Sequence, residues 1–446
     1  MTTDTIAAIA TAPGQGGIGI VRISGPDAGT ILRKVFRKAG KEKETFENRR
    51  MYYGRIYDGD ELLDECLAVL MRGPGSYTGE DVAELQLHGG GYVLQRVMET
   101  CIANGARPAG PGEFTRRAFL NGRIDLTQAE AVMSMISASG EQAHRAAARQ
   151  LDGGTATFIR KASERLYQLR AGLAACVDYP EEVTDEEAVA ELLPATEKLA
   201  DDLEAACDER SARIAREGLH VVFYGRPNVG KSSLLNALLG EERAIVTPIP
   251  GTTRDTVTGE LQLAGVRVHL TDTAGMRESN DPVEKIGVER TEKALKAADI
   301  PVLVLDAHQP PDREELEMLT KLPENGAVLL NKQDLTACAE ATDAASGKRV
   351  FECCAVRPET LDAFRNWIRE CASLPEQMVM TDPRHIHAAR EAVRRLRAAA
   401  DTMRAAPPDL AEVDLLAAQN ALASVTGEQA DEKLLDAVFS SFCVGK

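Results

Sequence analysis

The stretch GRPNVGKS at residues 225–232 constrains the fold of this chain more than any other feature. It fits the pattern G-x-x-x-x-G-K-[ST], which cradles phosphates where it follows a strand and opens a helix. The apolar run HVVFYG precedes it, and the helical pattern SSLLNALLG follows it. In that setting the glycines let backbone N–H groups face the phosphates, and the helix N-terminus adds a positive dipole. The stretch therefore predicts a nucleotide-binding α/β domain.

Two side chains of this loop have separate expected roles. Lys231 is expected to reach the β- and γ-phosphates, and Ser232 to hold Mg²⁺. The loop residues expected at the nucleotide are Asn228, Val229, Gly230, Lys231, Ser232 and Ser233.

The motif DTAG at residues 272–275 ends the apolar run VRVHLTDT. Asp272 is expected beside Mg²⁺ without binding it directly, and the Gly275 N–H is expected to face the γ-phosphate. The full set of contacts predicted here is Asp272, Thr273, Ala274 and Gly275. Many GTP-binding proteins place a water-orienting glutamine next, but this chain has Met276, which neither donates nor accepts usefully. Another group must then assist the chemistry.

The motif NKQD at residues 331–334 ends the apolar run AVLLNK. A carboxylate at Asp334 can accept hydrogen bonds from N1–H and N2–H₂ of guanine, a donor pair that adenine lacks. The motif therefore predicts selection of GTP over ATP. Asn331 and Lys332 are expected to brace the base and the phosphate loop, and Gln333 lies in the same contact set.

Two further loops complete the predicted nucleotide site. TPIPGTTRD at residues 247–255 lies where a GTPase keeps its first switch, and Thr253 is the expected Mg²⁺ ligand there. The switch residues predicted to contact GTP are Thr247, Pro248, Ile249, Pro250, Gly251, Thr252 and Thr253. After the strand at 349–352 comes Cys-Cys-Ala-Val instead of a Ser-Ala-Lys type loop. We expect backbone contacts to guanine to survive this change and a serine hydroxyl contribution to be lost.

The pattern of the chain predicts three domains of mixed α/β and helical class. Residues 1–120 contain short apolar runs between glycine-rich turns, which indicates a small α+β domain. Residues 217–375 alternate apolar runs with helical segments, which favours a mainly parallel sheet with helices on both faces, as in Ras-like G domains. Residues 121–215 and 376–446 are rich in Ala, Glu, Leu and Arg and predict one helical domain into which the G domain is inserted.

Charge and composition limit the classes of function. The net charge, 52 − 69 = −17, argues against a protein that coats nucleic acid. One arginine-rich helical pattern remains, for which a solvated helix face is favoured and an RNA contact is the alternative; its arginines are Arg384, Arg390, Arg394, Arg395, Arg397 and Arg404. No apolar run reaches about 18 residues, so no membrane span is expected. Nine scattered cysteines without a CxxC pair indicate reduced thiols and a cytoplasmic location.

With these motifs in place, the chain resembles one family along its whole length: the tRNA modification GTPases MnmE, also called TrmE. Beyond the G-domain motifs, the resemblance rests on DTIAAIATAPGQGGIGIVRISG (4–25), SYTGEDVAELQLHGG (76–90), RPAGPGEFTRRAFLNGRIDLTQAEA (107–131) and FSSFCVGK (439–446). These stretches have no counterpart in generic GTPases, so the match is specific.

The resemblance implies an answer to the problem posed by Met276. The family uses K⁺ where other GTPases use a catalytic arginine. Carried over residue by residue, the K⁺ ligands would be Asn228, Thr247, Ile249 and Thr252, and the water would be oriented through Glu284. The residues alone leave open two structural roles, a bracing role for Asn228 and a helix N-terminal role for Glu284.

The resemblance also implies a folate site. The N-terminal domain would bind a tetrahydrofolate derivative, 5,10-methylene- or 5-formyl-, in a homodimer. The positions that match the family's ligand contacts are Arg22, Glu84, Arg123 and Lys446. Arg123 departs from the lysine often found there, which keeps the charge and changes its geometry. Cys443 would be a functional thiol at the active centre. The alternatives are a strand-edge charge for Arg22 and an inert thiol for Cys443.

The function implied by the resemblance is K⁺-dependent GTP hydrolysis coupled to tRNA modification. With the FAD-containing partner MnmG, also called GidA, as a heterotetramer, it would add a carboxymethylaminomethyl-type group to carbon 5 of the wobble uridine. FAD would belong to the partner, since this chain has no G-x-G-x-x-G turn after a strand. The first alternative is an Era-like regulatory GTPase acting as an RNA or ribosome-assembly switch. The second, a folate scaffold with a degenerate GTPase, is disfavoured by the intact Lys231, Ser232, Thr253 and Asp334.

Overall fold

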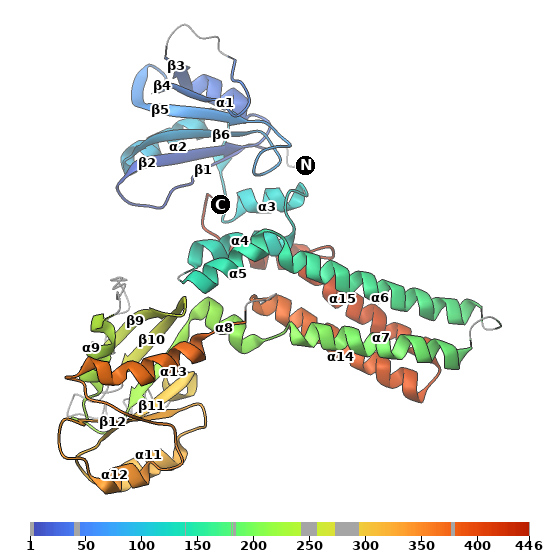
Figure 1. The fold of residues 1–446 in the computed structure, drawn as a ribbon. Helices are drawn as coiled ribbons and strands as arrows, with labels where there is room; N and C mark the ends of the chain where they lie inside the picture. Colours follow the sequence, from blue (N-terminus) through green and yellow to red (C-terminus); the bar gives the residue numbers. More distant parts are fainter. Residues whose placement is uncertain are drawn as a thin grey trace, which may run out of the picture. The chain divides into compact units, whose positions relative to one another are not determined.

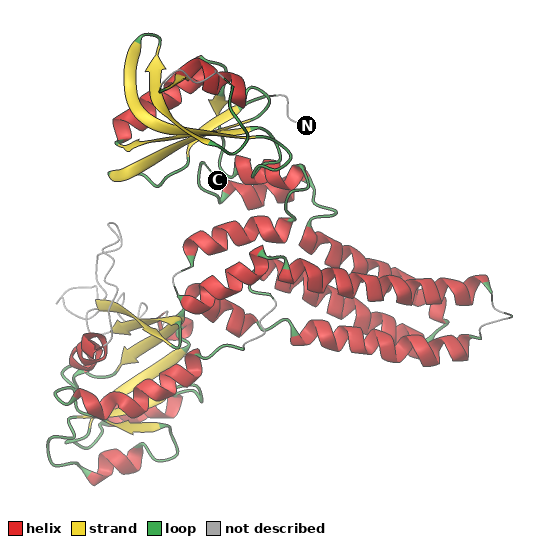
Figure 2. Ribbon diagram, turned by 45° about the horizontal axis from the view of Figure 1, so that its top comes forward, coloured by secondary structure: helices red, strands yellow, loops and turns green. Residues whose placement is uncertain are grey.

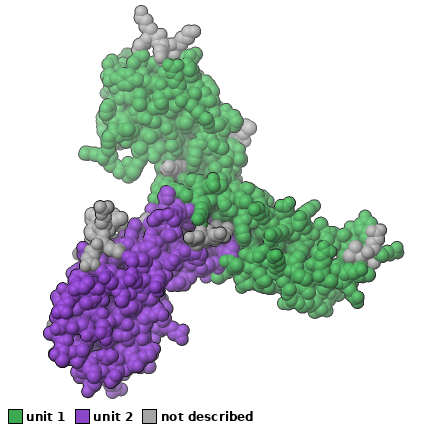
Figure 3. All heavy atoms as spheres, in the orientation of Figure 1, with its two compact units in different colours: residues 1–136, 148–205, 387–446 green, residues 137–147, 206–386 purple. Residues whose placement is uncertain are grey.

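The structure, a computed structural model, describes residues 4–39, 45–138, 140–179, 181, 184–241, 257–272, 294–375 and 380–445. The chain divides into two compact units, drawn in different colours in Figure 3. The first unit contains Met1–Ile136, Ala148–Ala205 and His387–Lys446, and the second contains Ser137–Ala147 and Ala206–Ile386. Among the described residues, no helix combines the length and the apolar composition that a membrane span needs.

A seven-stranded sheet opens the first unit, with strand order β3-β4-β5-β6-β2-β1-β7 (Figures 1 and 2). Neighbouring strands are antiparallel except β1 and β7, which are parallel. The strands are β1 (Ile6–Ile9), β2 (Gly16–Ser24), β3 (Phe36–Lys38), β4 (Met51–Asp58), β5 (Glu61–Met71), β6 (Val82–Gly89) and β7 (Arg107–Pro108). The helices of this part are α1 (Ala28–Val35), α2 (Gly91–Ala103) and α3 (Glu113–Leu120).

The two faces of this sheet differ because side chains alternate along each strand. On β4, the sequence MYYGRIYD alternates exposed and buried residues, and Tyr52 and Ile56 point into the core with α1 and α2. Tyr53 and Leu67 are cross-strand partners on the opposite face and are exposed. Arg22 and Glu84 pair in register on that opposite face. The predicted folate-contacting pair is therefore displayed away from α1 and α2.

Helices form the rest of the first unit (Figures 1 and 2). They are α4 (Leu126–Ser137), α5 (Glu141–Leu151), α6 (Gly154–Asp178), α7 (Asp185–Ala205), α14 (Pro383–Ala405), η3 (Pro408–Ala411), α15 (Glu412–Thr426) and α16 (Glu432–Ser440), with unit boundaries at or inside α4, α5 and α14. Helix α6 packs against both α7 and α15. The segments before and after the inserted G domain therefore pack together.

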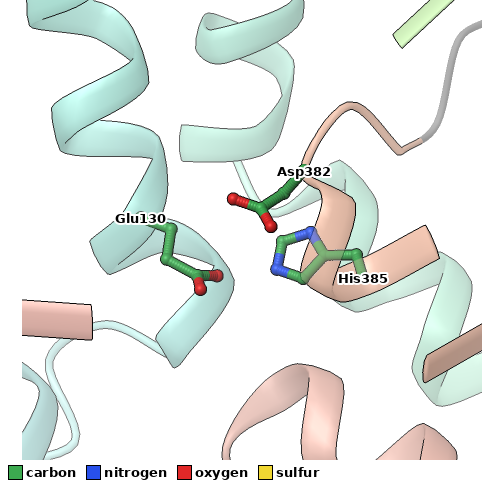
Figure 4. A group of neighbouring side chains, drawn as sticks. All are labelled: Glu130, Asp382 and His385. Atoms are coloured by element: carbon green, nitrogen blue, oxygen red, sulfur yellow. The ribbon is translucent and has the colours of Figure 1, made fainter. Parts of the chain in front are cut away.

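Helix α14 shows why the C-terminal segment is helical. Ala392, Leu396, Ala399 and Met403 are buried at a spacing of three or four residues, which places them on one face. At its N-terminus, the Asp382 carboxylate accepts a hydrogen bond from the backbone N–H of Arg384 at 2.8 Å, a local contact that satisfies an otherwise unpaired donor. Figure 4 shows Asp382 with His385 at this end of α14, and also Glu130 of α4.

Four of the six arginines of α14 are neutralised by neighbouring carboxylates. The ion pairs join Arg394 and Arg395 to Glu391, Arg395 to Asp414, Arg397 to Asp201 and Glu204, and Arg404 to Glu197 and Asp401. A phosphate-binding face needs uncompensated positive charge. The arrangement thus favours the solvated, ion-paired helix over an RNA contact.

A six-stranded sheet with strand order β13-β12-β11-β8-β10-β9 forms the centre of the second unit. All pairs are parallel except β9 and β10. The strands are β8 (Leu219–Tyr224), β9 (Val257–Leu263), β10 (Val266–Asp272), β11 (Ile300–Asp306), β12 (Ala327–Asn331) and β13 (Val350–Glu352). The helices are α8 (Glu209–Glu217), α9 (Lys231–Glu241), α11 (Arg313–Lys321), α12 (Ala339–Ala344), η2 (Pro358–Leu361) and α13 (Asp362–Ala372).

Two separate apolar clusters show that helices cover both faces of this sheet. One cluster joins the strands to Leu235 of α9 and Phe364 of α13. The other joins them to Leu319 of α11. Strands buried on both faces read as continuous apolar runs, which is why LHVVFY and AVLLN are so uniform. The predicted mixed α/β and helical class, with a P-loop domain of mainly parallel strands, is confirmed.

Candidate functional site: a guanine-nucleotide pocket and a second site on the N-terminal sheet

The phosphate loop lies between β8 and α9, at the carboxyl end of a central strand. Lys231 is almost fully buried, and its Nζ donates to the carbonyl oxygens of Gly225 at 3.0 Å and Arg226 at 2.6 Å. The loop thus curls around the ammonium group. Gly230 has φ +97, and an added Cβ would lie 2.2 Å from Nδ2 of Asn331. Only glycine fits at this point, because both the backbone angle and the close approach exclude a side chain.

The expected Mg²⁺ position is supported by a contact between two motifs. Ser232 Oγ donates to Asp272 Oδ2, which joins the first residues of α9 to the end of β10. Asp272 is fully buried. A hydroxyl beside a carboxylate offers the hard oxygen ligands that Mg²⁺ prefers. The residues present therefore fit the ion, and Ser232 would be the residue that binds it directly.

The predicted base-binding motif follows β12, and Asn331 ties it to the phosphate loop. Asn331 is buried; its Nδ2 donates to the Val229 carbonyl at 2.8 Å, and its Oδ1 accepts from the Ala355 N–H at 3.2 Å. Lys332 Nζ lies 2.6 Å from Asp306 Oδ2 at the end of β11. Of these three contacts, the one between Asn331 and Val229 reaches the phosphate loop. The bracing of the base by Asn331 and Lys332 stays a prediction.

Asp334, the residue expected to read guanine, is exposed and has a side-chain partner that the sequence did not reveal. Cys354 Sγ donates to Asp334 Oδ1 at 3.1 Å. This hydrogen bond is the largest of the influences that hold the pKa of Asp334 below its usual value. The expectation that a hydroxyl contribution would simply be lost in the Cys-Cys-Ala loop was incomplete, because the thiol occupies the donor position.

Asn228 is in the phosphate loop, as predicted, with a positive φ of 65. An amide oxygen is a suitable ligand for an alkali cation. The remaining K⁺, switch and water-orienting positions lie outside the described residues, and so does Lys446: they are Thr247, Pro248, Ile249, Pro250, Gly251, Thr252, Thr253, Thr273, Ala274, Gly275, Met276 and Glu284.

A second group of predicted residues gathers on the N-terminal sheet. Arg22 of β2 and Glu84 of β6 form an ion pair, with Nε and Oε1 2.8 Å apart and both side chains half-buried. The Arg22 guanidinium lies 5.8 Å from the ring centres of Tyr77 and of Phe114. A guanidinium over aromatic faces is held by cation–π attraction. Neither ring was among the predicted ligand contacts, although Tyr77 lies in the stretch SYTGED (76–81) and Phe114 in the stretch 107–131 that support the family resemblance.

The C-terminal residues lie against this same site. Gly112 N–H donates to the Cys443 carbonyl at 3.3 Å, and Pro111 and Val444 form a β-bridge. Arg22 Nη1 donates to the Gly445 carbonyl at 3.4 Å, across 423 residues of sequence. The Cys443 thiol is exposed. The structure thus brings Arg22, Glu84 and residues 443–445 together, and their role in binding a ligand stays a prediction.

Arg123 is attached to the same loop as Tyr77. Its Nε donates to the Ser76 carbonyl at 3.3 Å, and the residue is exposed. Its charge is therefore available to a ligand near the aromatic residues under Arg22. Charged groups beside the half-buried Tyr77 ring suit a ligand that has a flat ring and a carboxylate.

Together, the parallel sheet, the phosphate loop, the Ser232–Asp272 contact and the NKQD motif define a P-loop GTPase domain. The sequence also matches two described families, "GTP-binding protein TrmE N-terminus" over residues 5–123 and "MnmE helical domain" over residues 126–443. The chain belongs to the MnmE (TrmE) family, whose curated members are named tRNA modification GTPases.

Individual relatives match from end to end. The tRNA modification GTPase MnmE of Symbiobacterium thermophilum is 45% identical over 463 residues and covers 100% of both chains. The Chloroflexus aurantiacus protein of the same name is 45% identical over 454 residues, 99% of this chain and 100% of its own. A solved structure of a tyrosine-to-alanine variant of Aquifex aeolicus Era bound to GDP.AlF4⁻ aligns with 40% of this chain and 66% of its own, with 26% identity and a TM-score of 0.29.

Proposed function

We propose that this chain is a K⁺-dependent GTPase that drives modification of the wobble uridine in tRNA. One observation carries the proposal: in a chain of the MnmE family, Lys231, Ser232 with Asp272, and Asp334 lie at the carboxyl ends of the parallel strands β8, β10 and β12 of one sheet. Ligands of open parallel sheets bind at that edge. With an FAD-containing partner of the MnmG type, the chain would add a carboxymethylaminomethyl-type group to carbon 5 of the uridine.

Each residue of the pocket has a task in GTP hydrolysis. Asp334 accepts the guanine N1–H and N2–H₂, Lys231 gives up its two loop carbonyls for the phosphates, and Ser232 with Thr253 holds Mg²⁺. Asn228 would hold K⁺ through its amide oxygen, with Thr247, Ile249 and Thr252 as the other ligands, and Glu284 would orient the water. Bound K⁺ supplies the positive charge that an arginine supplies elsewhere.

The first test is GTP hydrolysis in K⁺ and in Na⁺ at equal ionic strength. We expect the rate in K⁺ to exceed that in Na⁺ by about tenfold or more, since a fixed charge at the transition state is worth at least that much. Asn228→Ala should remove the difference. Asn236→Ala, which changes an exposed asparagine of α9, is the matched control and should keep it.

Two results would contradict the proposal. Equal slow rates of the native protein in both salts would exclude the K⁺ site and favour the regulatory, Era-like switch. A difference that survives Asn228→Ala would mean that K⁺ acts elsewhere on the protein.

The site on the N-terminal sheet is proposed to bind a tetrahydrofolate derivative, 5,10-methylene- or 5-formyl-, in a homodimer. Glu84 suits the pterin N–H groups, and Arg22 and Arg123 suit the carboxylates. A one-carbon unit from the folate, with glycine or ammonium, would build the aminomethyl group, and the exposed Cys443 and Lys446 would serve at this centre. Tyr53 and Leu67 on the same exposed face of the sheet suit a contact with a second copy.

Replacing Arg22 tests the folate site separately from the GTPase. Arg22→Ala should weaken the binding of 5-formyltetrahydrofolate by about tenfold or more, because a charge-assisted hydrogen bond is lost. Calorimetric titration measures this, and GTP hydrolysis should be retained. Arg33→Ala on α1 is the control, since Arg33 is exposed and its Nη2 donates to Thr30 Oγ1 of the same helix. Unchanged binding in Arg22→Ala would place the folate elsewhere.

A further inference from the structure

Two adjacent cysteines after β13 have different surroundings. Cys353 lies in the apolar core of the G domain, fully buried, and burial raises the pKa of its thiol to about 12. The Cys354 thiol instead points at a carboxylate, with Sγ 3.1 Å from Asp334 Oδ1. Cys354 is also buried, so its thiol has little access to water as a competing partner. One thiol fills space, and the other makes a polar contact in the guanine pocket.

The backbone holds the Cys354 thiol in place from both sides. The Cys354 N–H donates to Thr360 Oγ1 at 2.8 Å, and the Cys354 carbonyl accepts from the Arg357 N–H at 2.9 Å. The next residue, Ala355, donates its N–H to Asn331 Oδ1 at 3.2 Å. The loop is therefore fixed to the NKQD motif through Asn331 as well as through Asp334. A thiol on such a fixed backbone has a defined direction.

The Cys354 donor affects the orientation of the Asp334 carboxylate, because Asp334 is exposed and its side chain is not held by surrounding packing. A free carboxylate rotates, and only one orientation presents both oxygens to the N1–H and N2–H₂ of guanine. A hydrogen bond to one oxygen restricts that rotation and reduces the ordering that binding must otherwise supply. We propose that Cys354 is a positioning residue for base recognition, whose S–H orients the Asp334 carboxylate for guanine. This inference rests on the proposed function, in which Asp334 reads the base.

The strength of the donor leads to a directional expectation. A thiol is a weaker hydrogen-bond donor than a hydroxyl. Serine at this position would offer the same geometry with a stronger donor, whereas alanine would offer none. The affinity of Cys354→Ser for GDP should therefore match or exceed that of the native protein, and the affinity of Cys354→Ala should be lower. If Cys354 only filled space, the GDP affinities of the serine and alanine variants would not differ in this way.

The test compares GDP with inosine diphosphate, which lacks the 2-amino group, on the full-length protein. Affinities are measured by calorimetric titration, and thermal unfolding is followed for each variant. The native protein should prefer GDP. We expect Cys354→Ala to weaken GDP binding by about tenfold and the preference for GDP by about fivefold. Cys354→Ser should restore both. Cys353→Ala is the matched control and should lower the unfolding temperature while leaving the preference unchanged.

The possible outcomes are distinct. The inference is overturned if Cys354→Ala keeps the native preference, or if it weakens both nucleotides equally with a lower unfolding temperature. It is also overturned if Cys354→Ser behaves like Cys354→Ala. If the native protein itself shows no preference for GDP, the proposed role of Asp334 fails, and the inference fails with it. A selective loss in Cys354→Ala with rescue by serine supports both.

Discussion

Asn331→Ala is expected to weaken GDP binding by about 100-fold, although Asn331 need not touch the nucleotide. The side chain is buried and satisfies two backbone groups: its Nδ2 donates to the Val229 carbonyl, and its Oδ1 accepts from the Ala355 N–H. Alanine leaves both groups without a partner and releases the phosphate loop from the base-binding loop. Two lost hydrogen bonds in a buried position account for the magnitude. Equilibrium titration with GDP measures it.

Two further variants separate the contacts of Asn331. Asn331→Asp keeps the acceptor for Ala355 but faces the Val229 carbonyl with a second oxygen, so it should lose most of the affinity as well. Asn325→Ala removes an exposed asparagine whose Nδ2 donates to the Asp299 carbonyl, and this variant should bind GDP as the native protein does. Near-native affinity in Asn331→Ala would show that the two loops are held together by other contacts.

The parts of this protein that sequence could predict are those with local signals. The strands of the G domain follow from uniform apolar runs, because a strand buried on both faces has no polar side. Lys231, Ser232, Asp272, Asn331 and Asp334 follow from motifs whose chemistry depends on spacing along the chain. Each motif lies at a strand end, and parallel strands bring such ends to one edge of a sheet.

The contacts that sequence could not predict depend on long-range packing. Nothing in the letters Cys-Cys-Ala shows which thiol faces Asp334, since that is set by how β13 and the following loop meet β12. The interaction of Arg22 with the Gly445 carbonyl joins opposite ends of the chain. The neutralisation of the α14 arginines likewise depends on carboxylates of α7 and α15 that only the fold brings near.

A second long-range arrangement is a buried ion network around Arg117 in the N-terminal part. The Arg117 side chain is 2% exposed; its Nη2 lies 2.9 Å from Asp4 and 3.0 Å from Glu113, and its Nη1 lies 3.1 Å from Glu80. Burial alone would lower the pKa of Arg117, but the hydrogen bonds that its guanidinium donates to Glu80 and Glu113 outweigh this effect and raise the pKa. One guanidinium therefore holds together the start of the chain, the SYTGED loop and α3.

Arg117→Met is expected to lower the free energy of unfolding by about 3 kcal/mol at pH 7, because it removes a buried guanidinium that pairs with three half-buried carboxylates at once. Arg117→Lys should lose less, since an ammonium keeps the charge without the guanidinium's planar set of donors. Arg116→Met on the same helix is the control: Arg116 pairs with the exposed Asp436 and should contribute at most about 1 kcal/mol. Denaturant unfolding of the three variants measures these differences.

The difference in unfolding free energy between the native protein and Arg117→Met should change with pH in a defined direction. Burial raises the pKa of Glu113, but hydrogen bonds from Arg107, the Gly110 N–H and Arg117 outweigh it and hold the pKa below its usual 4.5. A carboxyl with a lowered folded-state pKa stabilises the fold above its unfolded pKa, and that contribution disappears as the pH falls through the folded value. The gap between the native protein and Arg117→Met should therefore be widest near neutral pH and shrink below about pH 4.5. A gap that stayed constant with pH would mean that Arg117 stabilises the fold through packing of its side chain and not through its charge.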